Sequence, residues 1–546
     1  MRKLNTIMFL SIIIVSLLAL QTSFPQVTQE WVARYSGQGD SADNVRSMAA
    51  DRSGNVYVTG SSMGNGTSYD YVTIKYNAAG DSEWVARYNG PGNSNDVAIS
   101  IDIDNYGNVY VTGGSSNSNM DMDFLSIKYN SSGTQLWVSR YGGLNSDDFA
   151  ESVKADDSGN VFVTGSSGIG PATDIVTIKY SSNGDSLWVR RFNGASNLYD
   201  GAALIELDGL GNIYVSGVST GSSTGQDYAV IKYNNAGVQQ WIKSYNGPAN
   251  GNDHVKSIAA DNTGNIYVTG SSAVTSSKYD YYTIKYGSEG QLLWTARHIG
   301  RANFHDEANS IAVDNLRNVF VTGYVNDSTG SWDYGTIKYD SAGTEQWVAI
   351  YDGPGNYSDD AAYSIALDDS GNAYVTGFSE QSLNIPSFVT LKYNSFGIQQ
   401  WIQKYSGPGI NNIGIAVAVD SSGNVYVTGN SSGIDSNYDY ATIKYSQTTS
   451  IKQTSAEIPA RFSLSQNYPN PFNPKTIISY QITMINNVSL KVYNILGEEV
   501  SVLVNERQAP GSYQAEFDGS NLTSGVYFYR LEAGDFKDVK RMMLVK

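Results

Sequence analysis

The 546-residue sequence contains no cysteine, only three histidines and 12 prolines. Without cysteine the chain has no disulfide, no zinc–thiolate site and no thiol nucleophile, so its stability depends on packing and strand pairing. Long runs of helix-forming residues are also scarce, whereas the 55 glycines and 40 tyrosines are typical of an all-β protein.

Basic residues are outnumbered, with 35 against 52 acidic residues and a net charge of −17. The acidic excess lies in the middle of the chain, because residues 451–546 hold 10 basic and 9 acidic residues. Such a surface repels nucleic acid and anionic membranes, so we expect neither as a partner.

Long apolar runs are absent apart from Met8–Leu20, which lies shortly after Arg2 and Lys3. This 13-residue run is too short to span a bilayer comfortably, but its position is typical of a secretory signal peptide. We therefore predict a signal peptide over residues 1–26, with a membrane anchor as the alternative. No transmembrane segment is expected once it is removed.

Most of the chain consists of eight copies of one motif, whose core reads GNVYVTG at Gly54–Gly60. Each copy continues with a strand-like run that ends in IKY or LKY. A tryptophan recurs every 51 to 54 residues, at Trp31, Trp84, Trp137, Trp188, Trp241, Trp294, Trp347 and Trp401. Such a period indicates stacked copies of one supersecondary unit.

Each period predicts four short strands, joined by turns that contain Asp, Asn or Gly. Both faces of the strands are partly apolar, so each small sheet must pack between two neighbours, as in a propeller blade. The array begins at Trp31 with a fourth strand and ends at Tyr445 with a third strand. We therefore expect the N-terminal strand to complete the last blade and close an eight-bladed β-propeller over residues 27–446.

The core motif Asp-x-x-Gly-Asn-Val-Tyr-Val-Thr-Gly resembles the bacterial β-propeller repeat family known as SBBP, whose name stands for seven-bladed β-propeller. The resemblance implies the propeller fold and says very little about activity. Because the count of eight copies departs from the family's name, seven blades are the alternative.

Composition changes again near the C-terminus. Residues 447–460 read as a polar linker, and residues 461–546 as short strands of a small Ig-like β-sandwich. The Pro/Asn-rich run, the SGVY strand and the basic end resemble the type A C-terminal sorting domain of the type IX secretion system of Bacteroidetes. The residues that carry this resemblance are Asn467, Tyr468, Pro469, Asn470, Pro471, Phe472, Asn473, Pro474, Gly525, Val526, Tyr527, Lys537, Lys540, Arg541 and Lys546.

This resemblance implies export by the Sec route and then by the type IX machinery, which would be the partner of the C-terminal domain. The protein is then expected to be secreted or displayed on the outer cell surface. A fibronectin-like spacer domain is the alternative.

Two sets of aspartates recur once in each copy of the repeat, and we call each set a ladder. The first, Asp51, Asp104, Asp156, Asp208, Asp261, Asp314, Asp368 and Asp420, is expected to cap tight turns. The second consists of Asp43, Asp96, Asp148, Asp200, Asp253, Asp306 and Asp360, with Asn412 in the eighth copy. If the first strand is innermost, the second ladder forms a ring at the mouth of a central channel. A ring of carboxylates would bind Ca²⁺, whereas a turn-and-loop role is the alternative. No other cofactor is expected.

The periodic tryptophans are expected to pack between blades. Trp332 lies off the period, in the predicted loop NDSTGSWDYG, and is the tryptophan that we expect to contact a ligand.

Catalysis is not expected, because the three histidines form no recognised motif and no nucleophile elbow, HExxH pair or phosphate loop occurs. The sequence therefore predicts a secreted or surface-exposed scaffold that binds an extracellular glycan or protein through variable loops. One alternative is a carbohydrate-active enzyme, a glycosidase or lyase, with acidic residues at the channel mouth. A structural envelope protein is the third hypothesis.

Overall fold

The computed structural model describes residues 27–37, 41–142, 146–275, 278–300, 304–355, 358–380, 385–434, 437–447, 451–455, 457–484, 486–520 and 522–546. The predicted signal peptide therefore lies outside the described residues. The chain divides into two compact units, one over Val27–Thr448 and the other over Thr449–Lys546.

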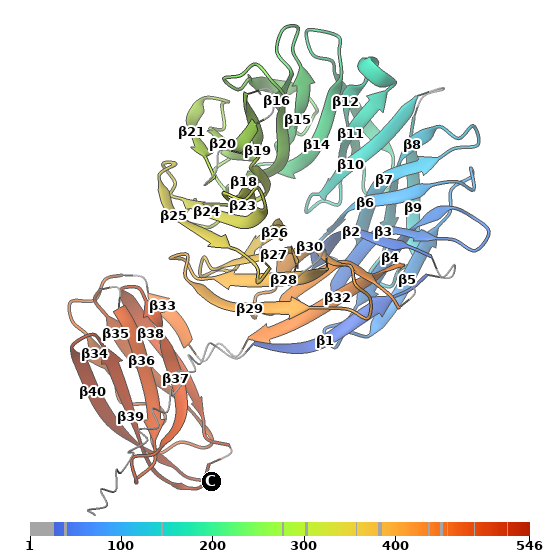
Figure 1. The fold of residues 1–546 in the computed structure, drawn as a ribbon. Coiled ribbons are helices and arrows are strands. Elements are labelled where there is room, and N and C mark those ends of the chain that lie inside the picture. The colour runs from blue at the N-terminus through green and yellow to red at the C-terminus, as the bar shows by residue number, and fades with distance from the viewer. Residues whose placement is uncertain are drawn as a thin grey trace, which may run out of the picture. The chain divides into compact units, whose positions relative to one another are not determined.

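The first unit consists of eight four-stranded antiparallel sheets (Figure 1). Sheet 1 contains β2 (Asp43–Ala50), β3 (Val56–Met63), β4 (Tyr69–Tyr76) and β5 (Ser82–Tyr88). Sheet 2 contains β6 (Asp96–Ile103), β7 (Val109–Ser116), β8 (Met122–Tyr129) and β9 (Gln135–Tyr141). Sheet 3 contains β10 (Asp147–Ala155), β11 (Val161–Gly168), β12 (Asp174–Tyr180) and β13 (Ser186–Phe192), with a short 3₁₀ helix, η1 (Gly170–Ala172), between β11 and β12. Sheet 4 contains β14 (Asp200–Leu207), β15 (Ile213–Thr220), β16 (Gln226–Tyr233) and β17 (Gln239–Tyr245).

The other four sheets repeat the same order. Sheet 5 contains β18 (Asp253–Ala260), β19 (Ile266–Thr275), β20 (Lys278–Tyr286) and β21 (Leu292–His298). Sheet 6 contains β22 (Glu307–Val313), β23 (Val319–Asn326), β24 (Trp332–Tyr339) and β25 (Glu345–Tyr351). Sheet 7 contains β26 (Asp360–Leu367), β27 (Ala373–Glu380), β28 (Pro386–Tyr393) and β29 (Gln399–Tyr405). Sheet 8 contains β30 (Asn412–Val419), β31 (Val425–Ser432), β32 (Tyr438–Gln447) and β1 (Val27–Tyr35).

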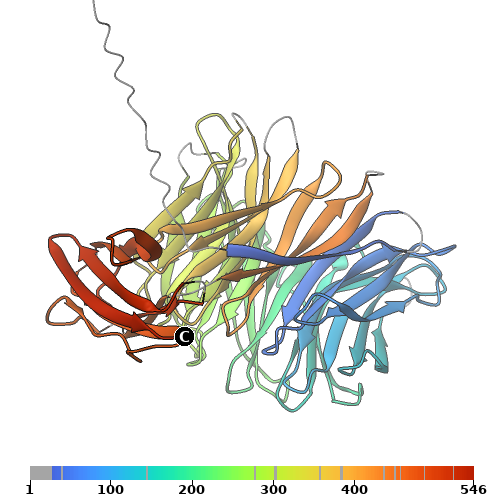
Figure 2. The ribbon, with the colours of Figure 1, turned by 90° about the horizontal axis from the view of Figure 1, so that it is seen from below.

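These sheets follow one another around a common axis, with the first strand of each sheet innermost (Figure 1). The first strands contact one another in sequence from β2 to β30, and β30 contacts β2 in turn. Figure 2 shows neighbouring sheets standing side by side. As the sequence predicted, β1 pairs antiparallel with β32, with Trp31 opposite Lys444 and Tyr35 opposite Tyr440.

The hairpin between the first and second strands depends on a residue with positive φ. Gly54 has a φ of 79°, a conformation that costs glycine nothing because it lacks a Cβ atom. In the sixth copy Arg317 occupies this position with a φ of 65°, so the turn geometry is kept although the glycine is lost.

The hydrophobic core of the first unit lies between sheets. Trp84 of sheet 1 packs 6.3 Å from Tyr57 of its own sheet and 6.0 Å from Tyr129 of sheet 2, measured between ring centroids. Its indole nitrogen donates to the Ser131 carbonyl of sheet 2 at 3.2 Å. The period of the tryptophans therefore reflects sheet-to-sheet packing, as expected, and not an array of ligand contacts.

The junction between sheets 8 and 1 has the same contacts. Trp31 of β1 packs 6.3 Å from both Tyr76 and Tyr426, and its indole nitrogen donates to Ala78 at 3.1 Å. The Tyr440 hydroxyl crosses the same junction to the Ser61 carbonyl, at 3.4 Å. The chemistry that joins consecutive sheets therefore also joins the last sheet to the first.

The second unit has two four-stranded antiparallel sheets that share one core. Sheet 9 contains β33 (Ile451–Ser455), β38 (Gly511–Asp518), β35 (Lys475–Ile482) and β34 (Ser463–Leu464). Sheet 10 contains β37 (Glu499–Gln508), β36 (Asn486–Tyr493), β39 (Gly525–Ala533) and β40 (Phe536–Leu544). Ile478 and Tyr480 from sheet 9 pack with Leu490 and Tyr529 from sheet 10. None of the described segments is a helix long and apolar enough to cross a membrane.

Part of the predicted linker is a strand. Residues 451–455 form β33, which pairs with β38 from Ile451 opposite Ala515 to Ser455 opposite Ser512. The sequence of this segment does not alternate between apolar and polar residues, which is the pattern that predicts a strand. Main-chain hydrogen bonds to the edge of a sheet do not depend on that pattern.

Replacing Trp31 with Ala is expected to lower the free energy of unfolding by about 2–4 kcal/mol, because it removes a half-buried ring from the junction of sheets 8 and 1. Urea denaturation followed by circular dichroism measures this change. The matched control is Trp84→Ala, which removes the same ring from the junction of sheets 1 and 2. A loss of stability in Trp84→Ala with none in Trp31→Ala would show that the first and last sheets are not joined.

Candidate functional site

The first aspartate ladder caps turns, as expected from the sequence. In all eight copies the Oδ1 atom accepts hydrogen bonds from the backbone amides two and four residues later, as Asp51 does from Ser53 and Asn55 at 2.9 Å. The Oδ2 atom accepts from the asparagine amide of the core motif, 2.7 Å away in the case of Asn55. These carboxylates are therefore committed to the hairpin.

The second ladder lies at the opposite end of the first strands, where its seven aspartates are buried with no exposed surface. In six of them a glycine amide from the preceding loop donates to the carboxylate, as Gly90 does to Asp96 at 2.6 Å. In the third copy Ser146 donates to Asp148 at 2.8 Å. The hypothesis of a carboxylate ring at the channel mouth does not describe this arrangement, because each side chain is turned into its own loop between sheets.

One aspartate of this ladder lies in a different environment. Asp360 lies beside Asp333 and Asp352, and one carboxylate oxygen from each residue lies within 4.8 Å of the other two. Burial raises the pKa of Asp360 to about 6, and the nearby Asp352 carboxylate adds to the rise. This is the one such group of three among the described residues.

Residues that depart from the repeat gather on one face of sheets 5 and 6. Glu307, the first residue of β22, pairs with Lys256 of β18 at 2.8 Å and with Nε2 of His305 at 3.3 Å. The Tyr324 hydroxyl on β23 also donates to Glu307, at 3.5 Å. Lys256 is the bulge residue that the ladder between β18 and β19 skips, and a bulge re-aims the side chain of the extra residue.

Electrostatics fix the charge state of this group. Burial alone would raise the pKa of Glu307, but hydrogen bonds and charges from His305 and Lys256 lower it to about 2. Burial and the Lys256 charge lower the pKa of His254. Glu307 is therefore ionised and His254 neutral near pH 7.

A row of aromatic rings runs along the same face, and we call it the aromatic row. Its members are His254, Tyr279, His305, Tyr324 and Trp332. Successive ring centroids are 5.8, 4.9, 5.8 and 4.5 Å apart, and the last two pairs are stacked. All members except Tyr324 are partly exposed. The row therefore presents ring faces and edges to solvent across sheets 5 and 6.

Trp332 is not in a loop, as the sequence analysis expected. It is the first residue of β24 and pairs with Asn326 on β23. Its equivalent in sheet 1 is Tyr69, the first residue of β4, so the position is regular and only the residue type differs. Because Trp332 is partly exposed and belongs to the aromatic row, it remains a candidate ligand contact.

A shallow cavity of about 340 Å³ adjoins the row at His254. Its walls come from sheets 4 and 5, and the lining residues are Tyr199, Gly201, Ala202, Val218, Gln226, His254, Val255 and Lys256. The cavity and the aromatic row together form a continuous non-repeating face.

A separate charged group lies farther along the first strands of sheets 2 to 4. Lys154 pairs with Glu206 at 3.1 Å, and Asp102 accepts from the Ala155 amide at 2.8 Å. Burial raises the pKa of Glu151, the bulge residue of β10, to about 7. The third histidine, His298, lies apart from the aromatic row and pairs with Glu345 at 3.3 Å.

In the second unit the predicted sorting residues gather along β40. The Phe472 amide donates to Met543 at 2.9 Å, and the Val545 amide donates to Phe472 at 3.0 Å. Asn467 is buried, and its side-chain amide donates to the Thr476 hydroxyl at 2.9 Å. Its backbone amide donates to the Tyr529 hydroxyl at 2.8 Å.

The other predicted sorting residues differ in exposure. Tyr527 is buried, while Pro474, Gly525, Val526 and Lys540 are half-buried. The exposed members are Tyr468, Pro469, Asn470, Pro471, Asn473, Lys537, Arg541 and Lys546. The Pro/Asn-rich run and the basic end, 60 or more residues apart in the chain, thus share one surface strip.

Sequence reasoning missed the aromatic row and the Asp333–Asp352–Asp360 group. Their members come from different periods, so no short motif links them. The sequence does mark this region when the eight copies are compared position by position. Glu307, Ile350 and Asp352 differ from the residues at the same place in the other copies.

Family models match both units. The model described as a beta-propeller repeat matches residues 30–66, 136–171, 240–276, 293–327 and 400–435. The model described as a secretion system C-terminal sorting domain matches residues 466–546. The chain therefore contains SBBP β-propeller repeats and a C-terminal sorting domain. This domain indicates export by the type IX secretion system to the cell surface or the extracellular space.

No curated protein matches the sequence. Among solved structures, the chain is similar to PorZ, a bacterial surface component of the type-IX secretion system of Porphyromonas gingivalis. The identity is 13% and the TM-score 0.40, over 94% of this chain and 68% of that one. A fungal alcohol oxidase of the AA5 family, in complex with copper, has 11% identity and a TM-score of 0.40, over 96% of this chain and 100% of that one. A protein of unknown function from Dyadobacter fermentans has 11% identity and a TM-score of 0.33, over 54% of this chain and 93% of that one. These values are too low to transfer a function.

Replacing Glu307 with Gln is expected to lower the free energy of unfolding at pH 7 by about 1–2 kcal/mol, because Lys256 and His305 lose a charged partner. The folded-state pKa of Glu307 is lowered from 4.5 to about 2, so its contribution is complete above pH 4.5. It is then lost as the pH falls toward 2, and the stabilities of the two proteins should converge there.

Urea titrations at several pH values measure this difference. Glu345→Gln is the matched control, because Glu345 also pairs with a histidine but is 47% exposed, and it should change the stability little at any pH. An equal effect of the two substitutions would contradict the assignment of Glu307 as the centre of a partly buried network.

Proposed function

We propose that this chain, with its β-propeller repeats and secretion system C-terminal sorting domain, is an exported eight-bladed β-propeller that binds an extracellular ligand. In this proposal β1 closes the ring as the fourth strand of sheet 8, and the sorting domain is an Ig-like sandwich. The pairing of β1 with β32 and the contact between β30 and β2 support eight blades over seven.

The aromatic row is the observation that carries the binding function. The row lies in sheets 5 and 6, and the other copies have different residue types at the positions of His254, His305 and Trp332. The packing of the sheets therefore does not require these rings. Partly exposed rings beside a fixed charge pair suit a ligand with apolar faces and polar edges, as a glycan chain has. Trp332 and Tyr279 would stack on the ligand, and Lys256 and Glu307 would bind its polar groups.

Binding without turnover is favoured at this face. A glycosidase requires one carboxyl that stays protonated to act as the acid, whereas the pKa of Glu307 is lowered to about 2. The raised pKa of Glu151, about 7, is the one observation that favours the second candidate, a carbohydrate-active enzyme, with this residue as its acid.

Glycan-array binding by the full mature chain tests the proposal. Trp332→Ala is expected to weaken binding at least about tenfold, because loss of an aromatic stacking partner costs about 1.4 kcal/mol or more. Tyr106→Ala is the matched control. Tyr106 is 76% exposed in the turn between β6 and β7, at the other end of the sheets, and its loss should leave binding unchanged.

Two outcomes would contradict the proposal. Equal binding by the wild type and Trp332→Ala would show that the aromatic row is not part of the ligand-binding site. Release of reducing ends from a bound glycan, abolished by Glu151→Gln, would establish the enzyme in place of the binding scaffold.

A further inference from the structure

An aspartate–arginine pair recurs on the outer half of the sheets. An aspartate near the start of the third strand accepts from an arginine near the end of the fourth strand, as Asp70 does from Arg87 at 2.7 Å. Five sheets have this pair, and the other four instances are Asp123 with Arg140, Asp174 with Arg191, Asp280 with Arg297, and Asp439 with Arg34. The arginine also donates to the serine that lies beside the buried ladder aspartate, as Arg87 does to Ser62.

Two of the remaining sheets also lack the arginine but add no acidic residue. Sheet 7 has Ser387 in place of the third-strand aspartate and Lys404 in place of the arginine. Sheet 4 keeps Asp227 but has Ser244 at the arginine position, and adds no acid.

Sheet 6 lacks the arginine as well, and it also adds an acidic residue. It keeps Asp333 as the third-strand aspartate, but Ile350 stands where the arginine would be. Two residues later Asp352 adds another acid, at a position where the other copies have Ser, Asn, Gly or Ile. Compared with the sheets that have the aspartate–arginine pair, sheet 6 therefore has one positive charge fewer and one negative charge more at the same place.

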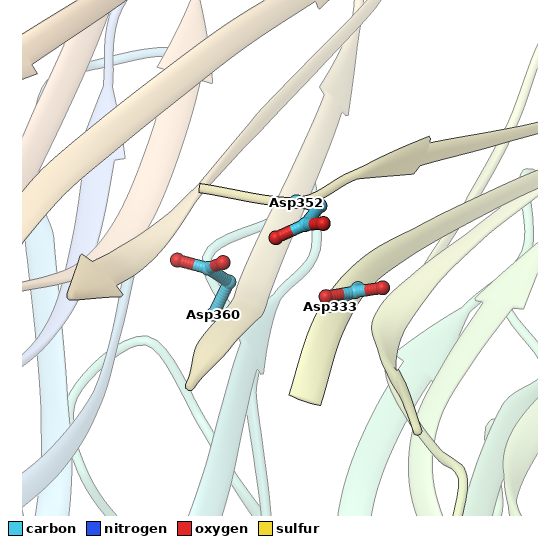
Figure 3. Close-up of side chains that lie close together, drawn as sticks. All are labelled: Asp333, Asp352 and Asp360. Carbon is cyan, nitrogen blue, oxygen red and sulfur yellow. The ribbon is translucent and has the colours of Figure 1, made fainter. Parts of the chain in front are cut away.

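The structure brings these residues to the junction of sheets 6 and 7. Asp333 comes from β24, Asp352 from the loop after β25 and Asp360 from the start of β26, and Figure 3 shows their side chains lying close together. One carboxylate oxygen from each lies within 4.8 Å of the other two. Asp333 and Asp360 are buried, whereas Asp352 is exposed and opens the group to solvent.

Asp360 has an oxygen available to a ligand. Its Oδ2 atom accepts from the Gly353 amide at 2.6 Å, but Oδ1 has no hydrogen-bond partner although the side chain has no exposed surface. Ser379 lies close enough to lower the pKa of Asp360, but its hydroxyl makes no hydrogen bond of regular geometry with Oδ1. The same oxygen has no hydrogen-bond partner in Asp43, whose sheet has the arginine, and in Asp200, whose sheet lacks the arginine but has Asn246 at the place of Asp352.

A basic residue, Lys404, lies near Asp360. Lys404 is near enough to lower the pKa of Asp360, but it is exposed and forms no ion pair among the described residues. Three carboxylates at this spacing repel one another strongly in a partly buried setting. A bound cation is the direct way to stabilise them.

We propose that Asp333, Asp352 and Asp360 bind a Ca²⁺ ion, which takes the place of the missing arginine at the junction of sheets 6 and 7. The donor set consists of carboxylate oxygens alone, the ligands that hard divalent cations prefer over those of zinc or copper. Calcium accepts six to eight oxygens in irregular geometry, and the exposed side of Asp352 leaves room for water ligands. An open site with three carboxylates is expected to have the affinity of extracellular calcium modules, about 10⁻⁴–10⁻³ M.

The ion would connect two sheets next to the aromatic row. Asp333 directly follows Trp332, and the Trp332 amide donates to Asp359, the residue before Asp360, at 3.1 Å. Calcium binding would therefore order the end of the aromatic row as well as the junction, although the proposal does not depend on ligand binding by that row.

Thermal unfolding and calorimetry of the full mature chain test this site. After treatment with a chelator, about 10 mM CaCl₂ is expected to raise the Tm by about 1–3 °C, and titration should give saturable heat. Asp352→Asn should weaken calcium binding at least about tenfold, since it removes one charged ligand while the exposed position tolerates the change. Ile350→Arg should restore the consensus pair, raise the calcium-free Tm and abolish the response to calcium.

Asp369→Asn is the matched control. Asp369 is an exposed aspartate in the turn at the other end of β26, and its substitution should leave the calcium response of the wild type intact. The proposal is overturned if the wild type shows neither heat nor a change in Tm, or if Asp352→Asn responds as the wild type does. An equal response to MgCl₂ and CaCl₂ in every variant would indicate charge screening alone and would also overturn it.

Discussion

At each junction between sheets, a tryptophan from the fourth strand packs between an aromatic ring of its own sheet and a tyrosine of the next. Its indole nitrogen donates to an oxygen of that next sheet, as Trp84 does to Ser131 and Trp31 to Ala78. A single four-stranded sheet of this sequence cannot bury its apolar surface, so each sheet is stable only with a neighbour on both sides. The last sheet obtains its fourth strand from the N-terminus, and with it the tryptophan that contacts sheet 1.

Sequence reasoning predicted the features that repeat. The period located the strands to within a few residues, and the end points of the array predicted the pairing of β1 with β32. The turn role of Asp51 and its equivalents followed from the position of an aspartate before a glycine in a hairpin. These features depend on residues that are close in the sequence or at a fixed spacing, where local chemistry determines the structure.

The features that sequence reasoning missed depend on contacts between copies. Asp333, Asp352 and Asp360 lie in two sheets and a loop, so their proximity follows from the arrangement of sheets and not from a motif. Trp332 was assigned to a loop because its neighbours are turn-forming residues, although the strand begins at that residue. In β33 the pairing partner, β38, supplies order that the polar sequence of residues 451–455 does not indicate. In a repeat protein the shared positions therefore specify the scaffold, and departures from them mark the sites to test.

The closed ring is the central claim, and the absence of cysteine makes it directly measurable. Thr28 on β1 lies opposite Ser446 on β32, and facing residues of antiparallel strands are about 4.5–5.5 Å apart between Cα atoms, close enough for a disulfide. In the double variant Thr28→Cys/Ser446→Cys, mild oxidation is expected to form one intrachain disulfide and to raise the Tm above that of the reduced protein. Failure to form this bond within the folded monomer, or an unchanged Tm once it has formed, would contradict a ring closed by the N-terminal strand.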